Sequence, residues 1–270
     1  MPISESDNWA TPLELHDDEI HVWLAFSNQI TDPDLLKRYH LYLNPLEAKK
    51  QKRFYFERDQ HQYLVTRGFI RSLLTRYVPE VRPSMWTFET NKYGRPSIVR
   101  EPEWPNLRFN ISHTRGLISI AVVKDLEVGV DVEQVTRDGE QIQIADRFFS
   151  KREVTELKSL PEANQKDRFF DYWTLKESYI KARGMGLSIP LGDFSFLLEE
   201  GRRIGIYIDP KQLDDPERWQ FRSWRVSDEH KMALTLERKP GVSFRLSLRK
   251  AVPLVGSEPF TCEMLRDSMD

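Results

Sequence analysis

Two carboxylates stand two residues apart in the segment Gly129-Val-Asp-Val-Glu133. In a strand, Asp131 and Glu133 would point to one face and the two valines to the other. The carboxylates would lie about 7 Å apart along the strand and would repel each other unless a cation or water lay between them. An edge strand with an exposed polar face has the same pattern. The apolar residues around the pair favour a largely buried strand.

The ligand types indicate which cation this strand would bind. Carboxylate oxygens are hard ligands, and the chain has one cysteine, Cys262, and no His-x-x-x-His spacing, so Mg²⁺ or Mn²⁺ is favoured over zinc. Mg²⁺ normally keeps several waters and completes its octahedron with substrate phosphate oxygens. A third carboxylate, Glu177, would suit the same coordination shell.

Glu177 belongs to a helical pattern that stops at Gly184 or Gly186. Trp173, Glu177 and Lys181 are four residues apart, so one face carries an indole, a carboxylate and an ammonium. Taken alone, this face is typical of a solvent-exposed Glu–Lys pair, which stabilises a helix by only about 0.3–0.5 kcal/mol. The interpretation therefore depends on what lies opposite.

Two other short motifs offer donors for phosphate. Phe109–His113 reads as a strand that ends at Ser112 and His113, whose hydroxyl and imidazole suit phosphate oxygens. A capping serine and a surface histidine would give the same pentapeptide. A nucleophilic Ser–His pair is disfavoured, because adjacent strand residues diverge and no Gly-x-Ser-x-Gly elbow is present. Arg95, in a turn with Gly94 and Pro96, could stack on a base and pair with phosphate.

Positive charge is concentrated between residues 36 and 76, where ten Lys and Arg face three acids. Lys50, Arg53 and Arg58 lie in this segment, on or beside a helix that Asn44-Pro45 would begin. Each alone reads as a solvated surface charge, but the local excess of seven calls for an anionic partner or a solvated basic face.

The elements that position these residues form a doubled pattern of strands and helices. We expect two similar α+β subdomains, residues 1–124 and 125–270, joined near Lys124–Val128. The expected strands are 20–26, 86–90, 107–111, 117–123 and 128–133, then 194–198, 204–208, 219–226, 232–237 and 242–248. The expected helices begin at 44–47 and at the Ser150 capping box, and span 65–77 and about 165–182.

Composition limits the class of protein. The chain has 270 residues, a net charge of −2 and a mean hydropathy of −0.58, with no apolar run of membrane-spanning length and no signal-peptide pattern. The near-neutral charge argues against a protein that coats nucleic acid. The single cysteine excludes a disulfide framework. We therefore expect a cytoplasmic protein that binds neither nucleic acid nor membrane.

In order and spacing, four segments resemble the 4′-phosphopantetheinyl transferase superfamily, specifically its surfactin-synthetase-activating branch. They are Gly94-Arg95-Pro96, Phe109–His113, Gly129–Glu133 and Trp173–Lys181, and the Lys50–Arg71 region resembles the family's basic N-terminal helix. The resemblance covers roughly residues 40–200. It departs from the family pattern at Arg95, where lysine is commoner, and at Thr114, where serine is commoner.

The resemblance implies a monomer in which two α+β subdomains, related by a pseudo-two-fold axis, bind coenzyme A in the cleft between them. It assigns Mg²⁺ (or Mn²⁺) to Asp131, Glu133 and Glu177, and places Lys181 on the phosphates or the leaving group. The residues implied to bind coenzyme A are Ser112, His113 and Lys176, with Arg95 beside the adenine and Lys50, Arg53 and Arg58 near the 3′-phosphate.

The implied reaction is attack by a carrier-protein serine on the β-phosphorus of coenzyme A, which releases adenosine 3′,5′-bisphosphate. Glu177 is the expected base. It would act either directly or through a metal-bound water, and the second route is equally acceptable because direct ligation to the metal lowers the basicity of Glu177. The partner is an apo acyl or peptidyl carrier domain, which we expect to dock on Thr136–Phe149 through Ile142, Ile144 and Phe148 unless that stripe is core. The alternatives are a Mg²⁺-dependent pyrophosphate hydrolase and a non-catalytic nucleotide-binding module.

Overall fold

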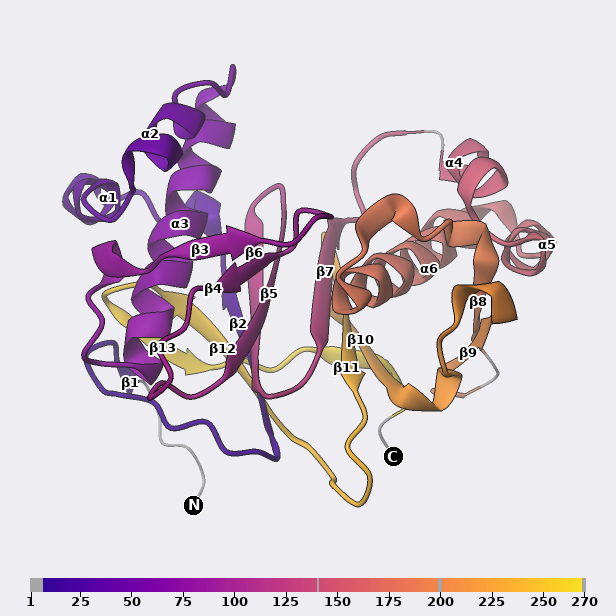
Figure 1. The fold of residues 1–270 in the computed structure, drawn as a ribbon. Helices are drawn as coiled ribbons and strands as arrows, with labels where there is room; N and C mark the ends of the chain where they lie inside the picture. Colours follow the sequence, from indigo (N-terminus) through magenta and orange to yellow (C-terminus); the bar gives the residue numbers. More distant parts are fainter. Residues whose placement is uncertain (1–6, 140, 199–200, 269–270) are drawn as a thin grey trace.

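The computed structural model describes residues 7–139, 141–198 and 201–268. Its two main sheets are flanked by helices, and two short hairpins form separate two-stranded sheets (Figure 1). The first sheet has the order β1 (Asp7–Asn8), β13 (Gly256–Pro259), β12 (Arg245–Val252), β2 (Glu19–Ala25), β6 (Leu117–Lys124), β5 (Leu107–Thr114). The second has the order β14 (Glu263–Asp267), β10 (Trp219–Ser227), β11 (His230–Glu237), β7 (Val128–Gln134). The hairpins pair β3 (Phe88–Thr90) with β4 (Pro96–Ile98), and β8 (Phe194–Leu197) with β9 (Gly205–Ile208).

The helices are divided between the two sheets, as Figure 1 shows. The first group is α1 (Pro33–His40), α2 (Pro45–Gln51) and α3 (Glu57–Tyr77), and the second is α4 (Gln141–Phe148), α5 (Lys151–Ser159) and α6 (Glu162–Arg183). Asn44 and Ser150 cap α2 and α5 with complete capping boxes, which confirms both predicted helix starts. The expected α+β class is confirmed.

Three apolar cores hold these layers together. One lies between α3 and the first sheet and includes Phe69 and Trp23; another lies around α6 and includes Leu175. The third joins the two sheets, since Val22 of the first packs in one cluster with Val130 of the second. Strands buried on both faces explain the near-continuous apolar runs of β2, β6 and β11.

β5 and β7 are the edge strands where the two sheets meet. Polar side chains at every second position of β5 reach across this seam and accept hydrogen bonds from β7 amides. The contacts are Val130 N to Asn110 Oδ1 (2.9 Å), Val132 N to Ser112 Oγ (3.2 Å) and Gln134 N to Thr114 Oγ1 (3.2 Å). The seam is therefore joined by side chains, and its middle contact places Ser112 beside β7.

Residues 245–259, near the end of the chain, return to the first sheet, whereas β14 after them joins the second. β12 pairs in parallel with β2, and β13 pairs with β12 and β1. The assignment of all of 125–270 to a second subdomain is therefore corrected for residues 245–259. An alternating strand pattern fixes which face of the strand is buried but not which sheet edge the strand joins.

Among the described residues, no helix combines the length and apolarity that a membrane span requires.

Candidate active site at the seam between the sheets

Asp131, Ser112 and Lys181 meet at the seam, one from each of β7, β5 and α6. The Lys181 ammonium lies 2.6 Å from Asp131 Oδ1 and donates to Ser112 Oγ at 2.9 Å. Ser112 donates its own proton to the same Asp131 oxygen at 2.9 Å. Asp131 and Ser112 are buried, whereas the Lys181 side chain is 27% exposed. The structure thus brings together three residues predicted from separate motifs, and of these only the Lys181 side chain is partly exposed.

Gly129 allows α6 to come close enough for this contact. A Cβ at this position would stand 2.0 Å from the Ser178 carbonyl oxygen and 2.5 Å from the Ala182 amide nitrogen. The helix backbone therefore lies directly on β7, two residues before Asp131 along the strand. α6 ends at Gly184 in the left-handed conformation (φ 64°), as the sequence predicts.

Glu177 lies one helical turn before Lys181 and is half-buried. No group among the described residues donates a hydrogen bond to its carboxylate. Burial, with a further contribution from the negative charge of Asp131, raises the pKa of Glu177 to about 7. A carboxyl group of this kind can accept and release a proton near neutral pH.

Glu133 follows Asp131 on the same strand face and is held by two side chains. The Trp173 indole donates to one carboxylate oxygen at 2.9 Å, and Arg137 pairs with the other at 2.8 Å. Burial and the charge of Asp131 raise the pKa of Glu133 to about 7. Trp173 also stacks on Phe169, with ring centroids 5.6 Å apart, so the indole links the α6 core to this carboxylate.

Asp131, Glu133 and Glu177 supply carboxylate oxygens of the kind that a hard divalent cation prefers, although as placed here they do not form a closed set of ligands. Within residues 7–139, 141–198 and 201–268, no three His, Cys, Asp or Glu side chains stand close enough to hold a metal. Asp131 Oδ2, however, is buried without a hydrogen-bond partner, an unfavourable state for a carboxylate oxygen. Burial and the charge of Asp131 raise the pKa values of Glu133 and Glu177, so their ionised forms are disfavoured even though Arg137 pairs with Glu133. Mg²⁺ would supply further positive charge at this position.

A cavity of about 1,100 Å³ opens next to this cluster. Its lining includes His113, Gln62 and Arg58, and extends to Arg137. Gln62 Nε2 lies 3.0 Å from His113 Nδ1. Burial of the ring, followed by the positive charge of Lys181, lowers the pKa of His113. The cavity matches the upper end of the size range of ligand pockets.

Lys50 and Arg53 line a second hollow of about 490 Å³ on the surface of α2. The positive charge of Lys50 makes a small contribution to the lowered pKa of His113. The buried Glu47 fixes α2, because it caps the helix and pairs with Arg67 and Arg71 of α3. Of the predicted phosphate ligands, His113 and Arg58 thus line the large cavity, and Lys50 and Arg53 line a hollow that shares Phe54 with it.

Comparison with known proteins agrees with this geometry. Residues 127–235 match the model of the 4′-phosphopantetheinyl transferase superfamily, and residues 32–124 match that of the 4′-phosphopantetheinyl transferase N-terminal region. The chain is 32% identical over 198 residues to the 4′-phosphopantetheinyl transferase Sfp of Bacillus subtilis, covering 73% of this chain and 84% of that protein. This chain belongs to the 4′-phosphopantetheinyl transferase superfamily.

Other relatives carry the same activity in their names. The transferase is 33% identical over 176 residues to the 4′-phosphopantetheinyl transferase HetI of a Nostoc species, covering 65% of this chain and 73% of that protein. It is 29% identical over 215 residues to the human L-aminoadipate-semialdehyde dehydrogenase-phosphopantetheinyl transferase, covering 74% and 68%. The resemblance predicted from four motifs is confirmed, and coenzyme A is the substrate that this family uses.

Lys176 does not lie in the cleft of the transferase, which corrects its predicted role. Its side chain is fully buried on the opposite side of α6, where the ammonium donates to the carbonyls of Leu191 and Phe194, both at 2.7 Å, and pairs with Glu153 at 2.7 Å. These contacts use all three N–H bonds, so none is left for coenzyme A. Adjacent helix positions diverge by about 100°, so Lys176 and Glu177 cannot share a face.

Arg95 holds the end of α6. Its guanidinium pairs with Glu127 and donates to the Ala182 carbonyl at 2.9 Å, while Asn91 in the same turn donates to the Gly184 carbonyl at 2.7 Å. These donors satisfy carbonyls that a helix end leaves unpaired. The turn is therefore fixed against α6, and the contact of Arg95 with the adenine stays a prediction.

Arg137 and Asn110 contribute to the site but were not singled out in the sequence. Arg137 lies beyond the end of the expected strand 128–133. The alternation of polar and apolar residues therefore did not predict that Arg137 contacts Glu133. Asn110 left a weak signal, since polar residues recur at every second position of Phe109–Thr114. That alternation indicates one polar strand face, but only the fold shows that the face covers another edge strand.

Proposed function

We propose that this transferase moves the 4′-phosphopantetheine group of coenzyme A to a serine of an apo acyl or peptidyl carrier domain, with Mg²⁺ at Asp131, Glu133 and Glu177. The observation that carries the proposal is the buried Asp131 carboxylate, which has Lys181 on one oxygen and no partner for the other. When bound there, Mg²⁺ neutralises charge on the phosphate oxygens.

The protein's own residues supply the proton acceptor, the positive charge on the phosphates and the orientation of that charge. Glu177, whose pKa is raised to about 7 in the metal-free protein and would be lowered by a bound cation, is the proposed acceptor of the carrier serine proton as the serine oxygen attacks the β-phosphorus. Lys181, whose side chain is partly exposed, stabilises charge on the phosphates when its ammonium exchanges its long contact with the Val130 carbonyl for a phosphate oxygen. Ser112 orients that ammonium, since its own proton is committed to Asp131. The phosphoanhydride bond breaks, and adenosine 3′,5′-bisphosphate leaves.

The cations beside the cleft are proposed to bind the nucleotide part of coenzyme A. His113 and Arg58 line the large cavity, and Lys50 and Arg53 line the adjoining hollow. Exposed ammonium and guanidinium groups suit phosphate oxygens, including a 3′-phosphate. We further propose a monomer, because both sides of the cleft come from one chain, and a cytoplasmic location, which the single cysteine supports.

The carrier is proposed to dock on the segment 136–149, with Phe148 as its apolar contact. Phe148 is 40% exposed, whereas Ile142 and Ile144 are partly buried against the core around α6. The predicted stripe of three exposed side chains is thus reduced to one, and Phe148→Asp becomes the suitable test. It should raise KM for the carrier and leave KM for coenzyme A unchanged. An equal rise in both would argue against docking there.

The deciding experiment is a mass measurement of purified apo-carriers after incubation with the protein, coenzyme A and Mg²⁺. A gain of one phosphopantetheine on a serine, abolished by EDTA, is the expected result. A hydrolase would instead release adenosine 3′,5′-bisphosphate at the same rate without any carrier. Binding of coenzyme A with neither product would favour a non-catalytic nucleotide-binding module.

A further inference from the structure

Lys231 is the cross-strand neighbour of Glu133, but its ammonium contacts other carboxylates. The two residues are direct partners in the antiparallel ladder of β11 and β7. Such partners project to the same sheet face, with Cβ atoms about 4.5–5.5 Å apart. Both side chains do contact α6, Glu133 through Trp173 and Lys231 through Asp171. A buried ammonium therefore neighbours a carboxylate of the proposed metal site.

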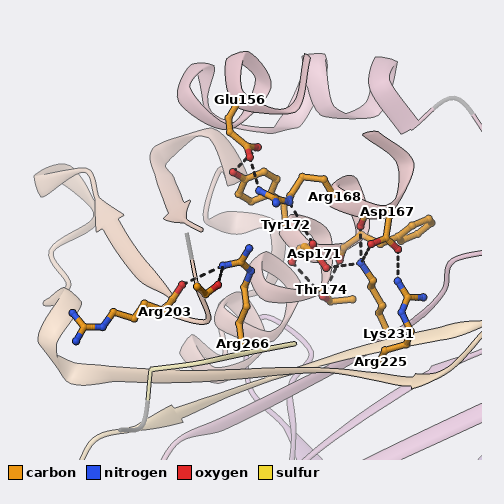
Figure 2. A network of polar contacts seen from close by, with 12 residues as sticks. Glu156, Asp167, Arg168, Asp171, Tyr172, Thr174, Arg203, Arg225, Lys231 and Arg266 are labelled. Carbon is orange, nitrogen blue, oxygen red and sulfur yellow. Dashed lines mark hydrogen bonds and ion pairs between the residues drawn. The ribbon is translucent and has the colours of Figure 1, made fainter. Parts of the chain in front are cut away.

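Two carboxylates of α6 engage this ammonium completely. Lys231 is 1% exposed, and its ammonium lies 2.5 Å from Asp171 Oδ1 and 2.7 Å from Asp167 Oδ2. It also donates to the Asp167 backbone carbonyl at 2.8 Å. These three contacts account for all three N–H bonds. Figure 2 shows the ammonium pointing to the helix, between the two aspartates.

The aspartates are themselves fixed by arginines on their far sides (Figure 2). Arg225 of β10 pairs with Asp167 at 2.5 Å, and Arg168 lies 3.4 Å from Asp171. Arg168 also pairs with Glu156 of α5, which accepts a hydrogen bond from the Tyr172 hydroxyl at 2.9 Å. A network that spans α5, α6, β10 and β11 thus determines where the Lys231 ammonium lies.

We propose that Asp171, assisted by Asp167, is a positioning residue that keeps the Lys231 ammonium away from Glu133 and so preserves the negative charge of Glu133 for a divalent cation. Without these aspartates, Glu133 is the carboxylate directly across the strand from Lys231, on the same sheet face. Glu133 already pairs with Arg137, so a second cation paired there would leave it no net negative charge and would repel a metal ion. The inference rests on the proposed function, because it assumes that the cation binds at Glu133.

The test measures Mn²⁺ binding to the whole protein without coenzyme A, by calorimetry or electron paramagnetic resonance. Asp171→Asn should weaken Mn²⁺ binding about tenfold, since a freed ammonium beside Glu133 opposes the cation. Adding Lys231→Met to that variant should restore binding to near the wild-type value. Glu156→Gln is the matched control, because it removes a carboxylate of the same network that does not touch Lys231, and it should bind Mn²⁺ normally.

The rescue separates positioning from a purely structural role. If the network served only to hold α6, the double variant would bind as poorly as the single one or worse, and the proposal would be overturned. Unchanged binding in Asp171→Asn would overturn it as well. If Glu133→Gln binds Mn²⁺ as the wild type does, the metal assignment fails instead. A crystal structure of Asp171→Asn then decides: Lys231 within hydrogen-bond distance of Glu133 supports the inference, and Lys231 still on α6 refutes it.

Discussion

The Lys181 ammonium lies 2.6 Å from Oδ1 of the buried Asp131 carboxylate, across the contact between α6 and β7. The two residues are fifty positions apart in the sequence, and a glycine on β7 allows their elements to touch. The pair leaves the second Asp131 oxygen without a partner and the Lys181 side chain partly exposed. The free Asp131 oxygen can therefore interact with a cation, whereas the ammonium, which also donates to Ser112 Oγ and the Val130 carbonyl, must exchange one of these contacts to bind an anion.

Lys181→Met should destabilise the fold as well as abolish transfer. Removing one partner of a buried ion pair costs about 3–5 kcal/mol, and partial exposure of Lys181 reduces the expected loss to about 2–3 kcal/mol. Urea unfolding measures this loss in the free energy of unfolding. The double variant Asp131→Asn, Lys181→Met should be more stable than Lys181→Met alone, because no uncompensated buried charge remains. Additive losses would contradict this coupling.

Glu177→Gln should reduce transfer by at least about 10²-fold while leaving the folded structure intact, because the amide cannot accept the serine proton. Single-turnover transfer to an apo-carrier measures the effect, and circular dichroism checks the fold. Near-normal turnover would rule out Glu177 as the base.

The stability of the metal-free protein should fall as the pH rises. Burial and Asp131 raise the pKa of Glu133 and Glu177 to about 7, so the folded state binds more protons than the unfolded chain above about pH 4.5. Their contribution is fully present below that pH and is lost as the pH rises through about 7. Melting temperatures in EDTA should show a shallower decline for Glu177→Gln than for the wild type. Saturating Mg²⁺, which favours the ionised carboxylates, should reduce the decline for the wild type, and identical slopes in all three samples would refute the argument.

Gly129→Ala should destabilise the protein severely, by about 4 kcal/mol or more, since the new methyl group would overlap helix backbone that cannot move aside. Thermal and urea unfolding measure the loss. Gly192→Ala is the matched control, because the nearest atoms to its Cβ are 3.8 Å away. Similar stabilities for the two variants would show that α6 can shift on β7.

Lys176→Met tests the corrected role of this lysine. The substitution leaves Glu153 buried without its cation, so we expect a stability loss of about 3–5 kcal/mol. KM for coenzyme A, measured below the melting transition, should change less than twofold. Loss of a charged contact with coenzyme A would raise this KM by more. A selective rise in that KM would return Lys176 to the coenzyme A site.

Local patterns correctly predicted the geometry within single elements at the candidate site. The alternation in Gly129–Glu133 gave a buried strand with Asp131 and Glu133 on one face, and the four-residue spacing placed Glu177 and Lys181 together. The capping boxes at Asn44 and Ser150 set two helix starts. These features depend on neighbours within one element, so the sequence contains all the information that they need.

Contacts between elements were decided only by the tertiary structure. Lys176 could not be assigned from its motif, because the direction of a helix face depends on what packs there. Residues 245–259 could not be assigned to a sheet, because strand pairing between distant segments depends on edges that the rest of the fold leaves open. The sequence by itself determined which side chains share a face. Only the packing of α6 and β5 on β7 determined that the Asp131 carboxylate meets Lys181 and Ser112, since each of those contacts joins residues that are distant in the chain.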